Sequence, residues 1–183
     1  MKTTWHVSAI MFAAMTLTSV LRADVKQDVE AMLQDAGIAG GFFVHLGAGD
    51  SGLTAALQVT PAIQVHGLVP DATKVAAIRE QIRAAGKYGN VSVVPFAGAE
   101  LPYIDNLVNL MVIEDQGQVS DEEILRVLVP NGVALEKDAS GAWMKIVKPR
   151  PTNIDDWSHY LHDASGNAVA HDDVVNSPPI HHN

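Results

Sequence analysis

The chain of 183 residues contains no cysteine, which excludes disulfide bonds, thiolate metal sites and cysteine nucleophiles. Basic residues are scarce as well, because 12 lysines and arginines stand against 21 aspartates and glutamates, a formal net charge of -9. A charge of that sign repels the phosphates of nucleic acids and anionic lipids, so neither is an expected partner. The 48% hydrophobic content suffices for one globular core and does not favour a second full domain.

The sequence also lacks an apolar run of the ~20 residues that a membrane-spanning helix requires, so no stable membrane span is expected. The run Val7–Leu21 is shorter, follows Lys2 and ends close to the small residue Ala23. This arrangement is typical of a secretory signal peptide, so we expect residues 1–23 to be such a peptide and the protein to be periplasmic or secreted. The alternative is a first core helix, but the run contains poor helix formers and is apolar on all sides.

Between residues 24 and 148, apolar residues recur in patterns that alternate between helix and strand. Helices are expected over residues 24–36, 53–57, 71–85 and 120–128, and strands over residues 42–46, 63–69, 91–96, 107–113 and 133–135. Such alternation through short connections is typical of a parallel sheet with helices on both faces. We therefore predict an α/β fold, a Rossmann-like three-layer sandwich with at least five parallel strands. Residues 143–147 are expected to close the sheet as a hairpin.

Single residues mark the expected helix ends. Gly37 is placed to end the first helix, and Asp71 is placed to cap the helix that follows the second strand. Ser120 and Glu123 have the spacing of a capping box, in which each side chain accepts a hydrogen bond from the other residue's backbone. These positions set the boundaries of the predicted helices.

The segment Gly47–Gly52, with the sequence GAGDSG, lies where the first strand ends and a helix begins. Glycines at this point let the backbone approach a ligand closely, and the free N–H groups of a helix start favour anionic or polar groups. The pattern alone has little specificity, but its place after a strand in an alternating chain favours a binding loop. The alternative is a tight turn that binds nothing.

Two later passages carry a resemblance to a known family. Residues 100–105 read ELPYID and precede the apolar run that ends at Glu114, and residues 123–132 read EILRVLVPNG. Together with the glycine loop, these passages resemble, in the same order, those of the class I S-adenosylmethionine (SAM) methyltransferases. The resemblance implies that SAM binds across the carboxyl ends of the strands and that its sulfonium methyl passes to a nucleophile by in-line displacement.

The resemblance also implies which residues contact SAM. These are Gly47, Gly49, Asp50, Gly52, Ala97, Glu100 and Leu101. It identifies no catalytic residue, and a catalytic base is expected only in general terms near Glu114 or Asp115. Under this interpretation the protein methylates a small molecule or a protein.

Three departures from the family pattern bear on the cofactor. His45 stands two positions before the first glycine, where the family has an acidic residue, and the third glycine is displaced from position 51 to Gly52. Val69 ends the second strand, where the family has an acid that accepts hydrogen bonds from the ribose hydroxyls. Losing that acid should cost about 2 to 4 kcal/mol, so SAM is expected to bind weakly or not at all, and Val69→Asp to improve binding. The same loss disfavours NAD.

The composition changes in residues 149–183, where prolines break regular structure and histidines and aspartates become dense. Imidazoles and carboxylates could ligate a divalent metal ion, but their spacing fits no compact zinc motif, and no metal site is assigned. The alternative is a docking strap, in which Trp157, Tyr160 and Leu161 pack at helical spacing onto a neighbouring domain.

This tail carries a second resemblance. Residues 154–163 read IDDWSHYLHD and residues 167–172 read NAVAHD. They resemble the junction in large exported bacterial proteins where a methyltransferase-like module precedes a β-propeller of the pyrroloquinoline quinone (PQQ) type. A propeller domain or protein is therefore an expected partner. Two hypotheses remain, a methyltransferase and a non-catalytic exported accessory module, and export favours the second because SAM is made in the cytosol.

Overall fold

The structure is a computed structural model, and it describes residues 25–49, 51–138, 140–153 and 164. The chain divides into two units, Met1–Lys148 and Pro149–Asn183, and the helices and strands described below belong to the first. The predicted signal peptide and most of the histidine-rich tail lie outside the described residues. Among the helices that are described, none has the length and apolar character needed to span a bilayer.

A six-stranded sheet forms the centre of the first unit, in the order β3-β2-β1-β4-β5-β6. The strands are β1 (Gly41–Leu46), β2 (Ile63–Val69), β3 (Val91–Pro95), β4 (Val108–Ile113), β5 (Leu128–Lys137) and β6 (Trp143–Val147). Strands β1 to β5 pair in parallel, and β6 returns antiparallel to β5 as a hairpin. The predicted sheet, with at least five parallel strands and a closing hairpin, is confirmed.

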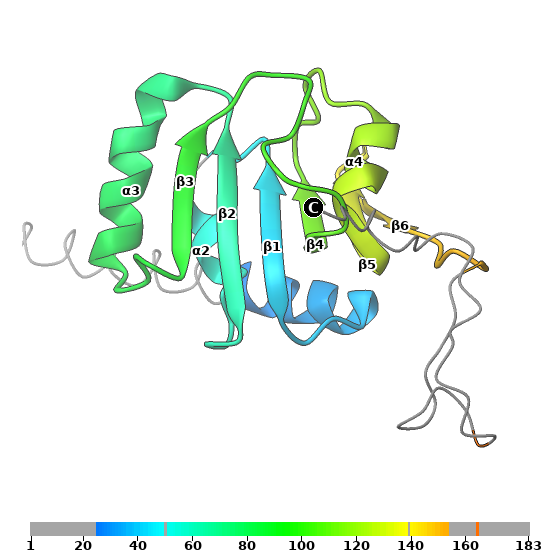
Figure 1. Cartoon of the computed structure of the whole chain (residues 1–183). Coiled ribbons are helices and arrows are strands. Elements are labelled where there is room, and N and C mark those ends of the chain that lie inside the picture. Colours follow the sequence, from blue (N-terminus) through cyan, green and yellow to red (C-terminus); the bar gives the residue numbers. More distant parts are fainter. Residues whose placement is uncertain (1–24, 50, 139, 154–163, 165–183) are drawn as a thin grey trace, which may run out of the picture. The chain divides into compact units, whose positions relative to one another are not determined.

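Helices cover both faces of this sheet (Figure 1). They are the helix of residues 25–36, α2 (Ser51–Ala56), the 3-10 turn η1 (Ala72–Lys74), α3 (Val75–Ala84) and α4 (Asp121–Val127). The first helix, α2 and α3 pack on one face, where Val75, Ile78 and Ile82 of α3 repeat at helical spacing and are buried. α4 packs on the opposite face through Ile124 and Val127. The predicted three-layer arrangement is therefore confirmed.

The helix ends follow the sequence signals with one exception. Gly37 ends the first helix with a positive φ of 72°, and its N–H donates to the Leu33 carbonyl at 3.0 Å. Asp71 accepts a hydrogen bond from the Thr73 N–H, as expected of a cap. Ser120 caps α4 by accepting from the Glu123 N–H at 3.2 Å, but the Glu123 carboxylate accepts from other donors. Only half of the predicted capping box is formed.

Strand β5 is much longer than the predicted 133–135, because it begins at Leu128, directly after α4. The letters PNG at residues 130–132 favour a turn, and Asn131 has the positive φ of 64° that a turn residue tolerates. The strand nevertheless continues, with a register shift against β4 between Val108 and Leu110. Hydrogen bonds between residues 131–132 and Lys148 hold the other side of this irregular stretch. Pairing on both sides thus overrides the local turn preference.

Candidate cofactor site

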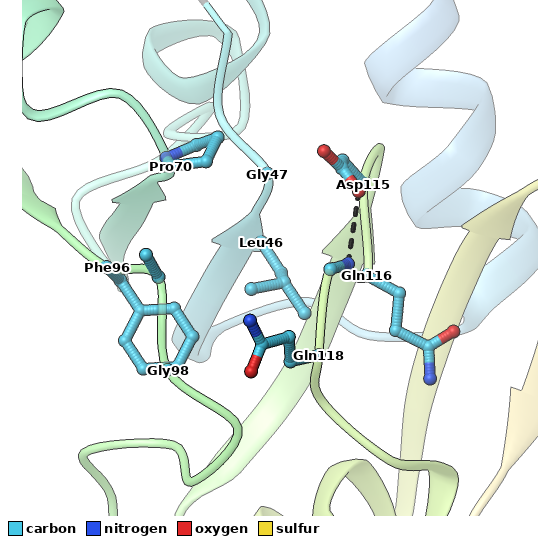
Figure 2. Close-up of a pocket in the computed structure, with 10 residues that line it drawn as sticks. Leu46, Gly47, Pro70, Phe96, Gly98, Asp115, Gln116 and Gln118 are labelled. Carbon is cyan, nitrogen blue, oxygen red and sulfur yellow. Dashed lines mark hydrogen bonds between the residues drawn. The ribbon is translucent and has the colours of Figure 1, made fainter.

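A cavity of about 180 Å³ lies where the carboxyl ends of β1 to β4 meet (Figure 2). Leu46 and Gly47 line it from β1, Pro70 from the end of β2, residues 96–98 from β3 and residues 115–118 from β4. Ligands in open parallel sheets bind outside the carboxyl ends of the strands, where the strand order reverses. That reversal falls between β1 and β4 here. The cavity therefore occupies the place in the fold where a ligand is expected.

The backbone conformation and the packing at the end of β1 require a glycine at position 47. Its φ is +78°, and a Cβ added there would lie 2.4 Å from the backbone nitrogen of Asp115 and 2.6 Å from its carbonyl oxygen. The N–H groups of Gly47 and Ala48 both donate to the Leu68 carbonyl, at 3.1 and 3.0 Å. Gly47 thus allows a close approach to the backbone of the loop after β4, and the close approach to a ligand stays a prediction. Helix α2 behind the loop has only six residues.

The structure brings two of the seven predicted cofactor residues to the cavity, Gly47 and Ala97. Gly49 and Gly52 are exposed and do not line it, and Asp50 lies outside the described residues. Glu100 is exposed and also does not line the cavity. Whether these residues hold a cofactor stays a prediction.

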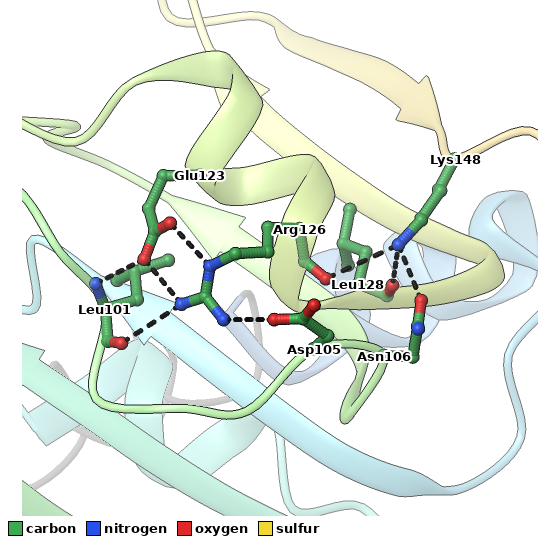
Figure 3. Close-up of polar contacts among 7 residues, drawn as sticks. All are labelled: Leu101, Asp105, Asn106, Glu123, Arg126, Leu128 and Lys148. Atoms are coloured by element: carbon green, nitrogen blue, oxygen red, sulfur yellow. Dashed lines mark hydrogen bonds and ion pairs between the residues drawn. The ribbon is translucent and has the colours of Figure 1, made fainter. Parts of the chain in front are cut away.

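Leu101 is part of the core instead, with 2% of its surface exposed. Its backbone N–H donates to the Glu123 carboxylate at 2.6 Å (Figure 3). Arg126 donates to both Glu123 and Asp105, and the hydrogen bond from Arg126 lowers the pKa of the Glu123 carboxyl. Beside these ion pairs, the Lys148 ammonium donates hydrogen bonds to Asn106 Oδ1 and to the Leu128 carbonyl. The two family-like passages therefore contact each other and fix the loop before β4.

The side chain that ends β2 offers no acceptor for a ribose. Val69 is 0% exposed and packs in the core cluster of the face that α3 covers. Its carbonyl accepts from the Phe96 N–H at 2.8 Å. Pro70, which follows and lines the cavity, has no N–H. On the β3 side, Ala97 and Gly98 add no polar side chain.

The polar side chains of the cavity all come from the loop after β4. Asp115 accepts from the Gly117 N–H at 3.0 Å through Oδ1. Gln116 donates through Nε2 to the Val119 carbonyl at 2.8 Å and to Asp121 at 2.9 Å. Gln118 forms no hydrogen bond with any other residue that the structure describes. Of these three side chains, the amide of Gln118 is thus the one that has no partner within the described chain.

A buried hydroxyl, an imidazole and a carboxylate line up on the α2 side of the same edge. His45 is 0% exposed, its Nδ1 lies 2.8 Å from Thr54 Oγ1, and its Nε2 lies 3.2 Å from Glu114 Oε2. Because a carboxylate only accepts, Nε2 donates to Glu114, and Nδ1 accepts from the Thr54 hydroxyl in the neutral ring. Thr54 is also 0% exposed, so its hydroxyl is closed to any substrate. The line is therefore structural rather than a nucleophile and its base.

This arrangement departs from the pattern of the resembled family at the end of β1. His45 stands where that family has an acid, and the acid, Glu114, stands at the end of the neighbouring strand β4. The hydrogen bond from His45 is the largest cause of a lowered pKa for the Glu114 carboxyl, and the Lys137 ammonium 3.5 Å away adds to it. The pair with Glu114 was not predicted, although a histidine inside the apolar run FFVHL signals a buried polar partner.

No three histidine, aspartate or glutamate side chains in the described part of the chain are grouped to hold a metal ion. The tail residues on which the two alternatives rest lie outside that part: the histidines and aspartates that could ligate a metal ion, and Trp157, Tyr160 and Leu161 of the docking strap. Both alternatives stay predictions.

Comparison with known proteins identifies the fold. No family model and no curated protein matches the chain. A candidate S-adenosyl-L-methionine-dependent methyltransferase from Methanococcus maripaludis matches with a TM-score of 0.57 and 20% identity, over 66% of this chain and 58% of that one. Geranyl diphosphate methyltransferase, solved in complex with SAM, matches with a TM-score of 0.53 and 18% identity, over 61% and 48%.

The cyclase SpnF also matches, with a TM-score of 0.53 and 23% identity, over 61% of this chain and 43% of that one. Identities at this level establish a shared fold, and the chain has the Rossmann-like fold of class I methyltransferases. It spans about half the length of these solved structures.

Proposed function

We propose that this chain is a methyltransferase-like domain that binds SAM, or a related adenine nucleoside, weakly at the carboxyl edge of β1 to β4. The observation that carries the proposal is the combination of a cavity at the glycine loop with a buried Val69 and a Pro70 wall where the ribose acid is missing. Absent hydrogen bonds to the two hydroxyls should weaken binding by about 2 to 4 kcal/mol, or roughly 30-fold to 1,000-fold.

The size of the cavity indicates that it holds only part of a SAM molecule. Pockets that enclose drug-sized ligands have roughly 300 to 1,000 Å³, whereas a cavity of about 150 Å³ holds a benzene molecule. The cavity of about 180 Å³ therefore accommodates one ring system of SAM and leaves the rest of the molecule over the open edge. When bound, SAM supplies an electrophilic methyl group on its sulfonium. The residues that would hold it are Leu46, Gly47, Phe96 and Gln118.

The lowered pKa of the Glu114 carboxyl favours the non-catalytic interpretation. A general base works best when its pKa lies near the working pH. The hydrogen bond from His45 and the nearby Lys137 ammonium lower the pKa of Glu114, so its carboxylate is ionised and a weak proton acceptor at neutral pH. We therefore propose a binding module rather than an active methyltransferase. The more specific proposal is an exported accessory module of a PQQ-like β-propeller protein, which rests on the sequence of the tail and of residues 1–23.

Isothermal titration of the full chain with SAM tests the proposal. We expect a dissociation constant from about 30 μM to 1 mM, which is the stated loss applied to a micromolar site. Geranyl diphosphate methyltransferase, whose structure contains SAM, serves as the positive control for ligand and instrument. A low-micromolar constant would show an intact site and favour the enzyme, and no heat at millimolar SAM would remove SAM as the ligand.

A further inference from the structure

The two edge strands of the sheet differ in how their outer backbone groups are satisfied. β3 stands at one edge and β6 at the other (Figure 1). The outer side of an edge strand carries N–H and C=O groups that can pair with another strand, and proteins commonly cover or block them. An edge without such protection is open to a partner strand.

The outer side of β3 is blocked along its length. Its hydrogen bonds to β2 come from even-numbered residues, so residues 91, 93 and 95 face away from the sheet. The Val91 N–H donates to the Lys87 carbonyl at 3.0 Å. The Val93 carbonyl accepts from Arg79 Nε and Nη2 at 3.0 and 2.8 Å, and Pro95 has no N–H. A further strand would therefore lose a hydrogen bond at each of these positions.

The outer side of β6 has no such protection within the described residues. The Ala142 carbonyl and the Lys148 N–H both bond across the hairpin to the β5 side, at 2.8 and 2.9 Å. Hydrogen-bonded residues alternate along an antiparallel ladder, so Trp143, Lys145 and Val147 turn their N–H and C=O groups to the outer side. No described residue bonds to these groups. β6 is therefore the edge that can accept a strand.

The side chains of β6 complement an antiparallel copy of the same strand. When Lys145 lies opposite itself across a twofold axis, Trp143 faces Val147 of the partner subunit on one side of the sheet. On the other side, Met144 faces Ile146 of the partner subunit. Aromatic and β-branched side chains stabilise a sheet when they lie opposite each other. Met144 is 50% and Val147 is 48% exposed, so this register covers apolar surface on both sides of β6.

The charges at the centre of this register are compensated. Two lysines directly opposite each other repel. Lys145 Nζ lies 3.9 Å from the Asp35 carboxylate and also donates to the Asp35 carbonyl, so each copy brings a carboxylate together with its ammonium. The two ion pairs are neutral as a group, which reduces the repulsion across the axis. The charge pattern of the edge therefore suits a second copy of this chain.

We propose that the chain forms a dimer through antiparallel pairing of β6 with β6 of a second copy, with Lys145 at the twofold axis. The two six-stranded sheets then continue as one sheet across the interface. This inference goes beyond the proposed function, because no ligand takes part in the pairing. Two strands of five residues make a small interface, so the expected dissociation constant is about 10 to 100 μM.

Sedimentation equilibrium of the full chain tests the association. From about 1 to 300 μM protein, the average mass should rise from 19.5 kDa toward twice that value. Lys145→Pro should weaken association by at least about tenfold, because proline removes an outward N–H and leaves the hydrogen bonds to β5 intact. Lys145→Ala is the matched control, since it removes the same ammonium and keeps the N–H. Its dissociation constant should stay within about threefold of that of the unmodified chain.

Cysteine cross-linking tests the register, and the chain has no cysteine of its own to compete. Opposite residues of a hydrogen-bonded antiparallel pair have Cα atoms ~5.5 Å apart, which is within the range of a disulfide. Lys145→Cys should therefore give a disulfide-linked dimer, with dissolved oxygen as the oxidant of the two thiols. Val147→Cys is the matched control, because the two copies of residue 147 lie about 13 Å apart along the strands in this register.

Each result supports or overturns the pairing. A chain that stays monomeric up to about 300 μM would overturn it. Association that Lys145→Pro leaves unchanged would place the interface elsewhere, for example at the apolar residues 7–21, and would also overturn it. If Lys145→Pro does not fold, the cysteine variants decide. A cross-link at position 145 without one at 147 supports the pairing, and equal cross-linking at both positions, or at neither, overturns it.

Discussion

Replacing Gly47 with alanine should destabilise the domain, because this glycine is needed for packing before any ligand is considered. At φ +78° an L residue pays roughly 1 to 2 kcal/mol for left-handed backbone. The new Cβ would also lie 2.4 to 2.7 Å from the backbone nitrogen, carbonyl oxygen and Cβ of Asp115. Displacing packed backbone costs a further ~1 to 3 kcal/mol. The expected loss is therefore about 2 to 5 kcal/mol.

Gly49 offers the matched control within the same loop. A Cβ there would meet nothing within 4 Å. Gly49→Ala should change the free energy of unfolding by no more than about 0.5 kcal/mol, as is usual at open surface positions. Urea unfolding followed by circular dichroism measures both variants. Equal stability of the two variants would refute the argument that Gly47 serves close packing against the β4 loop.

Three further predictions concern the end of β2, the end of β4 and residues 1–23. Val69→Asp should lower the midpoint of urea unfolding, because a carboxylate would replace an isopropyl group that is 0% exposed, and this cost would mask the gain in SAM affinity expected from the sequence. The lowered pKa of Glu114 means that its pairing stabilises the fold fully above the unfolded value of 4.5 and is lost as pH falls through the folded value. Glu114→Gln should therefore flatten the loss of stability below about pH 5, as measured by urea unfolding at a series of pH values. Mass spectrometry of protein from the native cell envelope should show a chain without residues 1–23, and an intact Met1 would contradict export.

The arrangement of the sheet could be predicted from the sequence because its signals are local. Buried parallel strands are continuous apolar runs, and β2 begins and ends at the predicted residues, Ile63 and Val69. Asp71 and Gly37 act through their immediate neighbours, and both end or cap a helix as predicted. Helix α3, with 10 residues, buries a single stripe that the spacing of its apolar residues specifies.

The site was less predictable because it depends on contacts between distant segments. Leu101 has the motif position of a cofactor residue, but the Glu123 carboxylate, 22 residues later, holds its backbone in the core. In the sequence, His45 indicates only that the acid of the family pattern is missing. The structure shows that His45 contacts Glu114, which lies 69 residues away in the sequence. Pro70, Phe96 and Gln118 line the cavity only because parallel strands end at one edge. Each follows directly or closely after a strand, a signal that could have identified them.

The affinity of the full chain for SAM tests the central claim most directly. The claim is that a class I methyltransferase fold has kept its ligand cavity and lost the group that binds the ribose, since Val69 is buried and Pro70 lines the wall. Isothermal titration should therefore give a dissociation constant from about 30 μM to 1 mM. A constant in the low micromolar range would contradict the claim, because it would require the ribose contacts that the end of β2 does not provide.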